Sequence, residues 1–243
     1  MNFIKTLLFF FLISSTILAQ TEKNIDHQNL LWTRYCNQLQ INAKWAIHSE
    51  FDNRVFLNPL VQNLFVIRVH SRYKISDQVD IGAGLASFSV ATQYPEIESG
   101  FNKPEYRVQQ DITWKQSFNK IALHQRFQIE ERFFQNFNRE GITSGTTFFW
   151  RFRYRIQGDY NFWENEKQYL KAIVYDELMI NAGEKIIYNT FDQNRIYAGL
   201  QYGINSSLAL ELGYLNSFQQ QVTGIGYFDR NIIRFTIYHK LKI

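Results

Sequence analysis

Residues 150–157 read WRFRYRIQ, in which aromatic or aliphatic side chains alternate with three arginines and a glutamine. A helix would spread both classes around its circumference, whereas a strand sends successive side chains to opposite faces. The apolar face of such a strand consists of Trp150, Phe152, Tyr154 and Ile156. The polar face consists of Arg151, Arg153, Arg155 and Gln157. The stretch therefore predicts a β-strand with one face in an apolar environment and the other in an aqueous one.

The same alternation recurs along most of the chain. The alternating segments are residues 29–37, 41–54, 62–76, 79–91, 105–118, 120–133, 146–159, 167–180, 193–205, 208–219 and 229–242. Pro59, Pro95 and Pro104 fall between them, as expected because proline lacks the backbone donor that a strand interior needs. Aromatic residues make up 17% of the chain, yet its mean hydropathy is −0.31. The pattern predicts an all-β protein with large apolar residues on one face only.

Short and long connections alternate between these segments. The long ones are expected at 55–61, 92–104, 134–145, 181–192 and 220–228. Short periplasmic turns at one end and longer extracellular loops at the other are typical of outer-membrane barrels, which usually have an even number of strands. Since the pattern yields eleven segments, we expect twelve strands, with ten as the alternative. The expected fold is a transmembrane, antiparallel, up-and-down β-barrel.

The amino terminus has the layout of a secretory signal, with Lys5, an apolar run over 7–13 and small or polar residues ending at Ala19. We expect residues 1–19 to be a cleaved signal peptide and residues 20–28 to be an extension or a short first strand. Residues 29–243 would form a single barrel in the outer membrane. The formal charge of +4 is dispersed among aromatic residues, which argues against nucleic-acid binding.

Alternation alone does not decide which face of the sheet points outward. A barrel of about eleven strands would be overfilled by aromatic side chains at most inward positions. An arginine at the bilayer midplane costs about 2 to 4 kcal/mol, so the three arginines of WRFRYRIQ are expected to face the lumen. We therefore predict rings towards lipid and Arg–Glu/Asp pairs as the main filling of the interior.

Two sets of residues follow from this assignment. The predicted lumen charge network is Glu50, Arg54, Arg68, Arg72, Glu105, Arg107, Asp111, Arg126, Glu130, Arg132, Arg151, Arg153, Arg155, Glu177, Arg195, Glu211, Arg230 and Arg234. The predicted lipid-facing residues are Trp45, Phe65, Ile67, Trp114, Trp150, Phe152, Tyr154, Leu210, Leu212 and Phe235. The arginines of WRFRYRIQ are expected to meet Glu130 on the preceding strand and Glu177 on the following one.

The hairpin of residues 105–133 allows a sharper prediction. A tight turn centred between Phe118 and Asn119 would set three opposite charges directly across from one another, which is favourable for cross-strand neighbours. The expected pairs are Glu105 with Arg132, Arg107 with Glu130, and Asp111 with Arg126. On the preceding segment, Gly82 and Gly84 lie at inward positions, where missing side chains leave room for long neighbours.

Several short motifs give the chain a family resemblance over about residues 30–243. They are Trp45 followed by Glu50 and Arg54, Glu130-Glu131-Arg132 with Gln135, Arg151-Phe152-Arg153-Tyr154, Glu177, Asn194-Arg195 and Gly213-Tyr214. With these motifs the chain resembles the bacterial family catalogued as domain of unknown function 2490, which is grouped with outer-membrane β-barrels. The resemblance implies a fold and a location but no activity. The carboxyl end is similar to an outer-membrane assembly signal, although it ends in Ile243 where Phe is usual.

Three roles remain open for such a barrel. The first is a lumen closed by salt bridges, the second is a narrow anion-favouring channel, and the third is an outer-membrane lipid hydrolase. A hydrolase needs a serine activated by a nearby histidine, but His48 and Ser49 are neighbours that a strand sends to opposite faces.

His48 and His70 beside Glu50 could bind zinc, yet a histidine among charges is more often part of a hydrogen-bond network. We expect no metal, cofactor or nucleic acid, and we expect outer-membrane lipid and the barrel-assembly machinery as partners.

Overall fold

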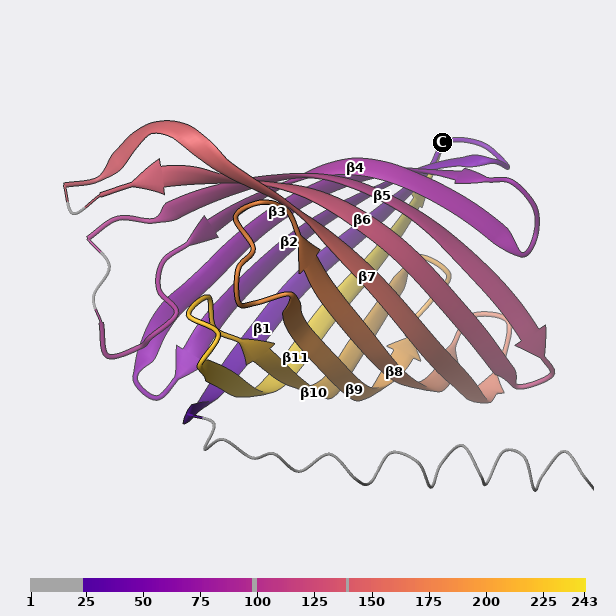
Figure 1. The fold of residues 1–243 in the computed structure, drawn as a ribbon. Coiled ribbons are helices and arrows are strands. Elements are labelled where there is room, and N and C mark those ends of the chain that lie inside the picture. Colours follow the sequence, from indigo (N-terminus) through magenta and orange to yellow (C-terminus); the bar gives the residue numbers. More distant parts are fainter. Residues whose placement is uncertain (1–23, 98–99, 139) are drawn as a thin grey trace, which may run out of the picture.

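The computed structural model describes residues 24–97, 100–138 and 140–243, which form a closed barrel of β-strands (Figure 1). The expected signal peptide, residues 1–19, and residues 20–23 lie outside the described residues. In chain order the strands are β1 (Asn24–Gln40), β2 (Trp45–Leu57), β3 (Leu60–Lys74), β4 (Val79–Val90), β5 (Lys103–Phe118), β6 (Ile121–Phe137), β7 (Ile142–Glu164), β8 (Tyr169–Ala182), β9 (Phe191–Gly203), β10 (Leu208–Gln220) and β11 (Gly226–Lys242). The prediction of an all-β barrel is thus confirmed.

Each strand pairs antiparallel with its neighbours in sequence, and the barrel closes where β1 meets β11. With eleven strands in the described part of the chain, the first and last strands run in the same direction, so this closing pair is parallel. The expectation of twelve or ten strands was wrong. Residues 24–28 continue directly into the segment predicted at 29–37, and together they form the single strand β1.

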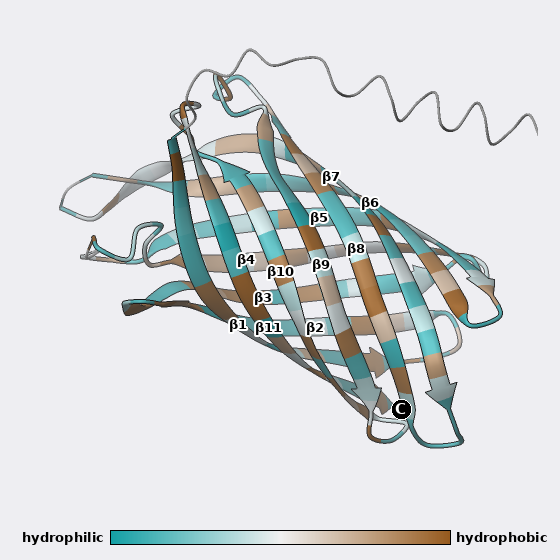
Figure 2. Ribbon diagram, turned by 90° about the horizontal axis from the view of Figure 1, so that it is seen from below, coloured by the Kyte–Doolittle hydropathy of each residue, from teal (hydrophilic) through white to brown (hydrophobic). Residues whose placement is uncertain are grey.

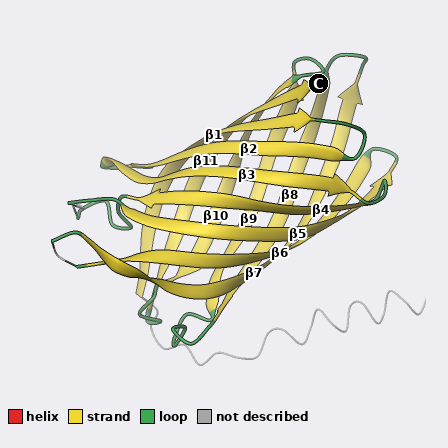
Figure 3. Cartoon of the chain, turned by 90° about the horizontal axis from the view of Figure 1, so that it is seen from above, coloured by secondary structure: helices red, strands yellow, loops and turns green. Residues whose placement is uncertain are grey.

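The connections differ less in length than the sequence suggested, as the green segments of Figure 3 show. The connection between β4 and β5, described over residues 91–97 and 100–102, and the connection of residues 183–190 lie at one mouth of the barrel, which we call the loop mouth. The long connections predicted at 55–61 and 134–145 are mostly strand, because β2 and β3 continue to a tight turn at 58–59 and β7 begins at Ile142. The opposite mouth, which we call the turn mouth, carries the turns at 41–44, 75–78, 119–120, 165–168 and 204–207.

Four turns at the turn mouth share one local mechanism. A side-chain oxygen at the second position, or at the first position in 165–168, accepts two backbone N–H groups further along the turn. The acceptors are Asn42, Ser76, Asn165 and Asn205, with N···O distances of 2.8 to 3.3 Å. Such side chains satisfy backbone donors that the strands leave unpaired, which is why Asn and Ser recur in turns.

Alternation of apolar and polar residues is visible along the strands in Figure 2. Around the barrel the outward positions carry large apolar side chains. The inward positions are polar on β5 and mostly polar on β6 and β7, where Phe134 and Phe149 are exceptions, and elsewhere they include further apolar residues. One inner cluster consists of Leu30, Trp32, Phe56, Ile173, Tyr175, Tyr197, Leu215 and Ile232, and a second consists of Leu64, Val66, Ala86 and Phe88. The expectation of a lumen filled mainly by ion pairs therefore holds for only part of the wall.

Glycines make room for large inward side chains, as expected for β4. A Cβ added at Gly82 would lie 2.6 Å from a ring atom of His70, and one added at Gly84 would lie 2.5 Å from the same ring. On β9 and β10, Gly199 and Gly213 do the same for Tyr197, whose hydroxyl would be 2.3 and 2.4 Å from their added Cβ atoms. Inward bulk is thus matched by missing side chains on the next strand, and at Gly199 on the same strand.

No helix within the described ranges is both long and apolar enough to cross a membrane.

Candidate functional site

The arginines of WRFRYRIQ lie on the inner face of β7, where they bind two buried glutamates on the flanking strands. Arg151 Nε donates to Glu130 Oε2 at 2.8 Å, and Arg153 Nη1 donates to Glu130 Oε1 at 2.6 Å. Arg153 Nη2 reaches Glu177 on β8 at 2.8 Å, and Arg155 reaches the same glutamate at 3.2 Å. Glu130 and Glu177 are fully buried. Arg153 therefore bridges two carboxylates across three strands.

Further ion pairs extend this core in both directions. Arg107 joins Glu105 to Glu130, and Arg132 Nε donates to Glu105 at 2.6 Å. Arg126 Nη2 donates to Glu177 at 2.7 Å, and Arg151 Nη1 donates to Asp192 at 2.8 Å. We call the connected set the central network: Glu105, Arg107, Arg126, Glu130, Arg132, Arg151, Arg153, Arg155, Glu177 and Asp192. Removing charges from water is costly, and these multiple charge-assisted hydrogen bonds offset that cost.

The predicted register of the β5–β6 hairpin was wrong by two residues. Its turn is centred on Asn119 and Lys120, because Asn119 adopts the left-handed conformation, with φ of 53°, that such a tight turn requires. Glu105 therefore lies opposite Phe134, and Arg107 lies opposite Arg132. Two of the three expected ion pairs form diagonally instead, whereas Asp111 and Arg126 take other partners.

Smaller clusters occupy the wall of β1 to β5. Glu50 binds Arg34 and Arg68, Asp52 binds Arg54 at 2.6 Å, and Asp111 binds Arg72 at 2.7 Å and His70 at 3.1 Å. Each of these carboxylates lies on the inner face beside the cations of neighbouring strands. The charges of this wall are therefore paired locally and do not belong to the central network.

On the side of β9 to β11, Glu211 is the centre of a mixed cluster. It accepts hydrogen bonds from Arg234 and the hydroxyl of Tyr197, both at 2.7 Å, and from Gln201 at 3.0 Å. Arg234 also stacks on Tyr197, with its guanidinium carbon 3.8 Å from the ring centre. Tyrosine supplies both the hydrogen bond and the apolar surface here, so the cluster joins the charged and apolar parts of the inner wall.

The structure places every residue of the predicted lumen set on the inner face. Most belong to the clusters described above. Arg195 and Arg230 are the exceptions within the described residues, because neither has a carboxylate at hydrogen-bond distance. The residues predicted to face lipid all lie on the outer face. Trp45, Trp114 and Leu212 are 44%, 46% and 58% exposed, while Phe152, Leu210 and Phe235 are half-buried between their neighbours.

Sequence reasoning missed Asp192, a member of the central network. Simple alternation from Gln193 and Arg195 turns Asp192 outward, and residue 192 falls within the connection predicted at 181–192. A β-bulge opposite Met179 and Ile180 shifts the register there, so both Asp192 and Gln193 are buried in the lumen. Bulges re-aim side chains in this way, and they have no reliable sequence signal. Arg34 was also missed, although it shares a face with Trp32 and Cys36.

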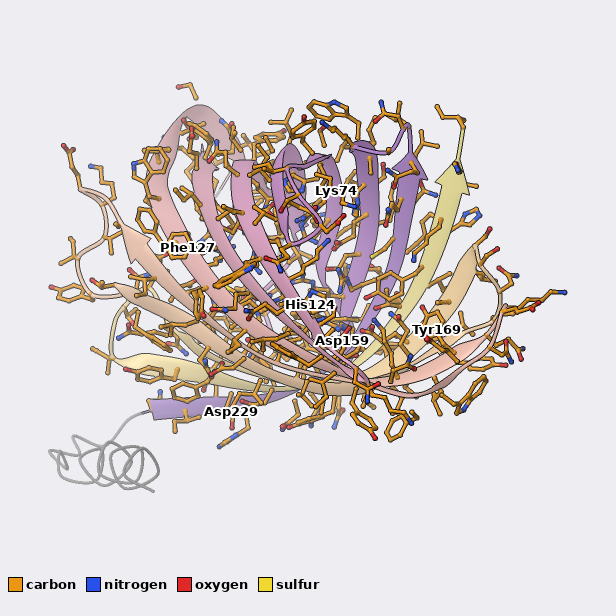
Figure 4. The ribbon with its side chains drawn as sticks, turned by 90° about the vertical axis from the view of Figure 1, so that its right-hand side faces the viewer. Lys74, His124, Phe127, Asp159, Tyr169 and Asp229 are labelled. Carbon is orange, nitrogen blue, oxygen red and sulfur yellow. The ribbon has the colours of Figure 1, made fainter. Side chains whose placement is uncertain are left out.

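Three cavities follow one another along the lumen, since neighbouring ones share lining residues. The outer cavity, at the loop mouth, has a volume of about 350 Å³, the middle one about 190 Å³ and the inner one, at the turn mouth, about 570 Å³. His124 and Asp159 lie near the turn mouth inside the barrel (Figure 4), 3.7 Å apart. Eight arginines and Lys103 line the outer cavity, against the carboxylates of Glu105 and Asp192. Nine arginines line the middle cavity, against Glu50, Asp52 and Asp111.

His48 and His70 face each other across β2 and β3, as the zinc hypothesis required. Within the described residues, however, no group of three or more His, Cys, Asp or Glu side chains is arranged to hold a metal ion. His70 instead contacts Asp111 and packs over the space left by Gly82 and Gly84.

The fold and its interior define a class of protein, a closed β-barrel with a cation-rich lumen. The chain belongs to a family described as "Protein of unknown function (DUF2490)", whose model matches residues 29–227. This match confirms the resemblance seen in the motifs around Glu130, Arg151 and Glu177. No curated protein matches the chain.

Proposed function

We propose that the chain is an integral outer-membrane β-barrel protein whose lumen is closed by the central network. The observation that carries this proposal is the outer face. Phe51, Val69, Leu85, Ile196 and Leu212 lie on five different strands and are 45% to 64% exposed. Soluble proteins rarely expose continuous apolar patches larger than a few hundred Å². Acyl chains would cover such a surface, and a closed barrel leaves no unpaired strand edge in lipid.

Aromatic side chains at both ends of the strands support the same orientation. Trp114, Phe118, Tyr160 and Trp163 lie on the outer face towards the turn mouth, and all are more than 40% exposed. Trp150 and the stacked rings of Phe218 and Tyr227 lie towards the loop mouth. Membrane barrels carry aromatic girdles at both interfaces. The turn mouth would then face the periplasm and the loop mouth the cell exterior.

Several polar side chains of the outer face are paired with each other. Asp176 accepts a hydrogen bond from Asn194 at 2.5 Å, and Glu131 accepts one from Gln110 at 3.3 Å. Pairing reduces the cost of placing polar groups against lipid, because each donor keeps an acceptor. Outer-membrane lipid is accordingly the proposed surrounding. The barrel-assembly machinery is the proposed partner during insertion, and β11 would present it with outward Ile233, Phe235 and Ile237.

The closed lumen is inferred from the burial of the central network. A water-filled bore would leave inward carboxylates in contact with solvent, but Glu130 and Glu177 are fully buried among arginines. A narrow anion-favouring channel is the alternative, and the excess of arginines over carboxylates along the cavities favours it.

Gel mobility tests the barrel, and conductance tests its closure. Full-length protein refolded in detergent should resist SDS at room temperature and shift in mobility after boiling. In cells it should remain in the membrane fraction after alkaline extraction. Identical mobility before and after boiling, with release by alkali, would contradict a membrane barrel. In planar bilayers the closed lumen predicts no stepwise current, whereas anion-selective steps would favour the channel.

A further inference from the structure

Arg195 and Arg230 differ from the other described arginines of the lumen in having no carboxylate of a described residue at hydrogen-bond distance. Arg230 donates only to amide oxygens, those of Gln28, Gln93 and Gln219, at 2.7 to 2.8 Å. Arg195 Nε donates to Gln193 Oε1 at 3.0 Å, and its nearest carboxylate oxygen, on Glu177, is 4.0 Å away. Both guanidiniums thus donate to amide oxygens and not to carboxylates, and both retain unused N–H donors.

The two arginines lie at the same level of the barrel wall. Ser217 on β10 is the register partner of Arg195 on β9 and also of Arg230 on β11. With strands roughly 4.8 Å apart, the two Cα atoms are separated by about 10 Å. Long guanidinium side chains on two such strands can converge on one anion between them. Both side chains line the outer cavity, together with Ser217.

A third observation comes from Trp32 on β1, which lines the same cavity. Its ring lies between two cations, 3.7 Å from the guanidinium carbon of Arg54 and 5.2 Å from that of Arg195. Its buried indole N–H has no acceptor among the described residues. A buried donor without a partner is costly, and here it lies in the wall of the cavity that Arg195 and Arg230 also line.

The walls of the outer cavity are apolar as well as cationic. Phe88, Phe134, Phe149 and Phe228 line it, and Arg107, Arg132 and Arg230 stack on these rings at 3.5 to 4.9 Å. Stacking holds the guanidiniums against the wall and leaves ring surface around them. Cavities of roughly 300 Å³ or more with apolar walls and a few convergent polar groups are typical small-molecule sites.

We propose that the outer cavity binds a small organic anion. Its carboxylate or phosphate group binds Arg195 and Arg230, and its aromatic or aliphatic body packs against the phenylalanines. Arginine suits this role because its planar donors match both oxyanions. This proposal rests on the proposed function in one respect. Because the central network closes the lumen beneath the outer cavity, the cavity is a binding pocket open at the loop mouth and not part of a channel.

Phenyl phosphate and benzoate are suitable probes, with inorganic phosphate, benzyl alcohol and benzyltrimethylammonium as comparisons. Binding to the refolded full-length barrel would be measured by calorimetry and by tryptophan fluorescence. Trp32 is 5% exposed, whereas Trp45, Trp114, Trp150 and Trp163 lie on the outer face, so Trp32 is the expected reporter. Trp32→Phe should abolish the fluorescence response while calorimetry still detects the anion.

Substitutions at the two arginines provide the decisive comparison. Arg195→Gln and Arg230→Gln should each weaken phenyl phosphate binding by about tenfold or more, since each removes a charged hydrogen bond. Arg195→Lys, which keeps the charge, should weaken it less. Lys44→Gln removes the same charge at the inner cavity and should leave affinity within about twofold.

Defined outcomes would overturn the assignment. Equal losses of phenyl phosphate affinity in Arg195→Gln, Arg230→Gln and Lys44→Gln would show that binding depends on overall charge and not on a specific site. Equal binding of benzyl alcohol, or of inorganic phosphate alone, would refute the organic anion as the ligand class. Absence of binding by phenyl phosphate and benzoate, in a barrel that still shifts on boiling, would refute the site alone. Loss of the gel shift in the unsubstituted protein would instead refute the membrane barrel.

Discussion

Replacement of Glu130 by glutamine is the sharpest test of the central network. Glu130 is fully buried, and it accepts hydrogen bonds from Arg107, Arg151 and Arg153 as well as from Gln109 and Gln128. Glu130→Gln removes the negative charge and turns an amide N–H₂ group towards guanidinium donors. Breaking a buried ion pair by removing one partner costs about 3 to 5 kcal/mol, so we expect a loss of that size in the free energy of unfolding.

Glu131→Gln is a matched control on the same strand. Its side chain lies on the outer face and accepts one hydrogen bond, from Gln110 at 3.3 Å, so the same chemical change should alter stability by less than about 0.5 kcal/mol. Both variants would be unfolded with urea in lipid vesicles, with tryptophan fluorescence and gel mobility as readouts. Equal losses of unfolding free energy in Glu130→Gln and Glu131→Gln would refute the reasoning, because a carboxylate of the central network would then contribute no more to stability than a carboxylate on the outer face.

A double substitution tests how strongly Glu130 is coupled to one of its cations. Removing Arg151 as well takes away one of the cations that the lost charge had neutralised. The double variant Glu130→Gln/Arg151→Gln should therefore lose less than the sum of the two single changes, by at least about 1 kcal/mol. Strict additivity of the two losses would show that Glu130 and Arg151 are not energetically coupled, contrary to their 2.8 Å contact.

Other parts of the barrel allow independent tests. Asn205→Ala should destabilise the barrel by about 1 kcal/mol in urea unfolding, because Asn205 Oδ1 accepts the N–H groups of Ser207 and Leu208, both at 2.8 Å. Ser206→Ala is the control and should leave stability unchanged. A larger loss of stability in Ser206→Ala than in Asn205→Ala would disprove a role for this acceptor. Gly213→Ala should cost about 1 to 3 kcal/mol, because the new Cβ would lie 2.4 Å from the Tyr197 hydroxyl and 2.6 Å from a backbone carbonyl. Gly158→Ala, with its nearest atom at 3.7 Å, is the control, and similar losses would contradict the tight packing at Tyr197. Brominated lipids should quench the fluorescence of the four outer tryptophans but not that of Trp32. The emission that remains should therefore be absent in Trp32→Phe. Complete quenching of the unsubstituted protein would contradict the placement of Trp32 on the inner face.

The inner and outer faces could be predicted best where charge and aromatic residues alternate strictly. In WRFRYRIQ every second residue is an arginine or a glutamine, so the period of two assigns each side chain and also predicts Glu130 and Glu177 as partners. The alternation is lost where both faces are apolar, as at Ile173-Val174-Tyr175 and Ile232-Ile233. The inner apolar clusters could not be predicted there, because an apolar outer face and an apolar lumen core carry similar side chains.

Register and strand count depended on features that local patterns do not encode. The position of the β5–β6 turn follows from the backbone conformation of Asn119, and a shift of one residue in the turn centre moves every facing pair by two. The bulge at Asp192 likewise follows from tertiary pairing with β8. The expectation of an even strand number rested on what is usual for such barrels and not on a residue of this chain. By contrast, the turn residues Asn42, Ser76, Asn165 and Asn205 were available in the sequence and could have fixed these turns.

Parallel closure between β1 and β11 has a topological consequence. Asn24 pairs with Gly226 at the loop mouth, whereas Gln40 pairs with Lys242 at the turn mouth. A linker from Lys242 back to Asn24 would have to cover the 17 residues of β1, roughly 55 Å along the strand. Circular permutation with a short linker, which suits barrels whose first and last strands are antiparallel, is therefore excluded. If the barrel spans a membrane as proposed, epitope tags placed beside Asn24 and beside Lys242 would be accessible to antibodies from opposite sides of it.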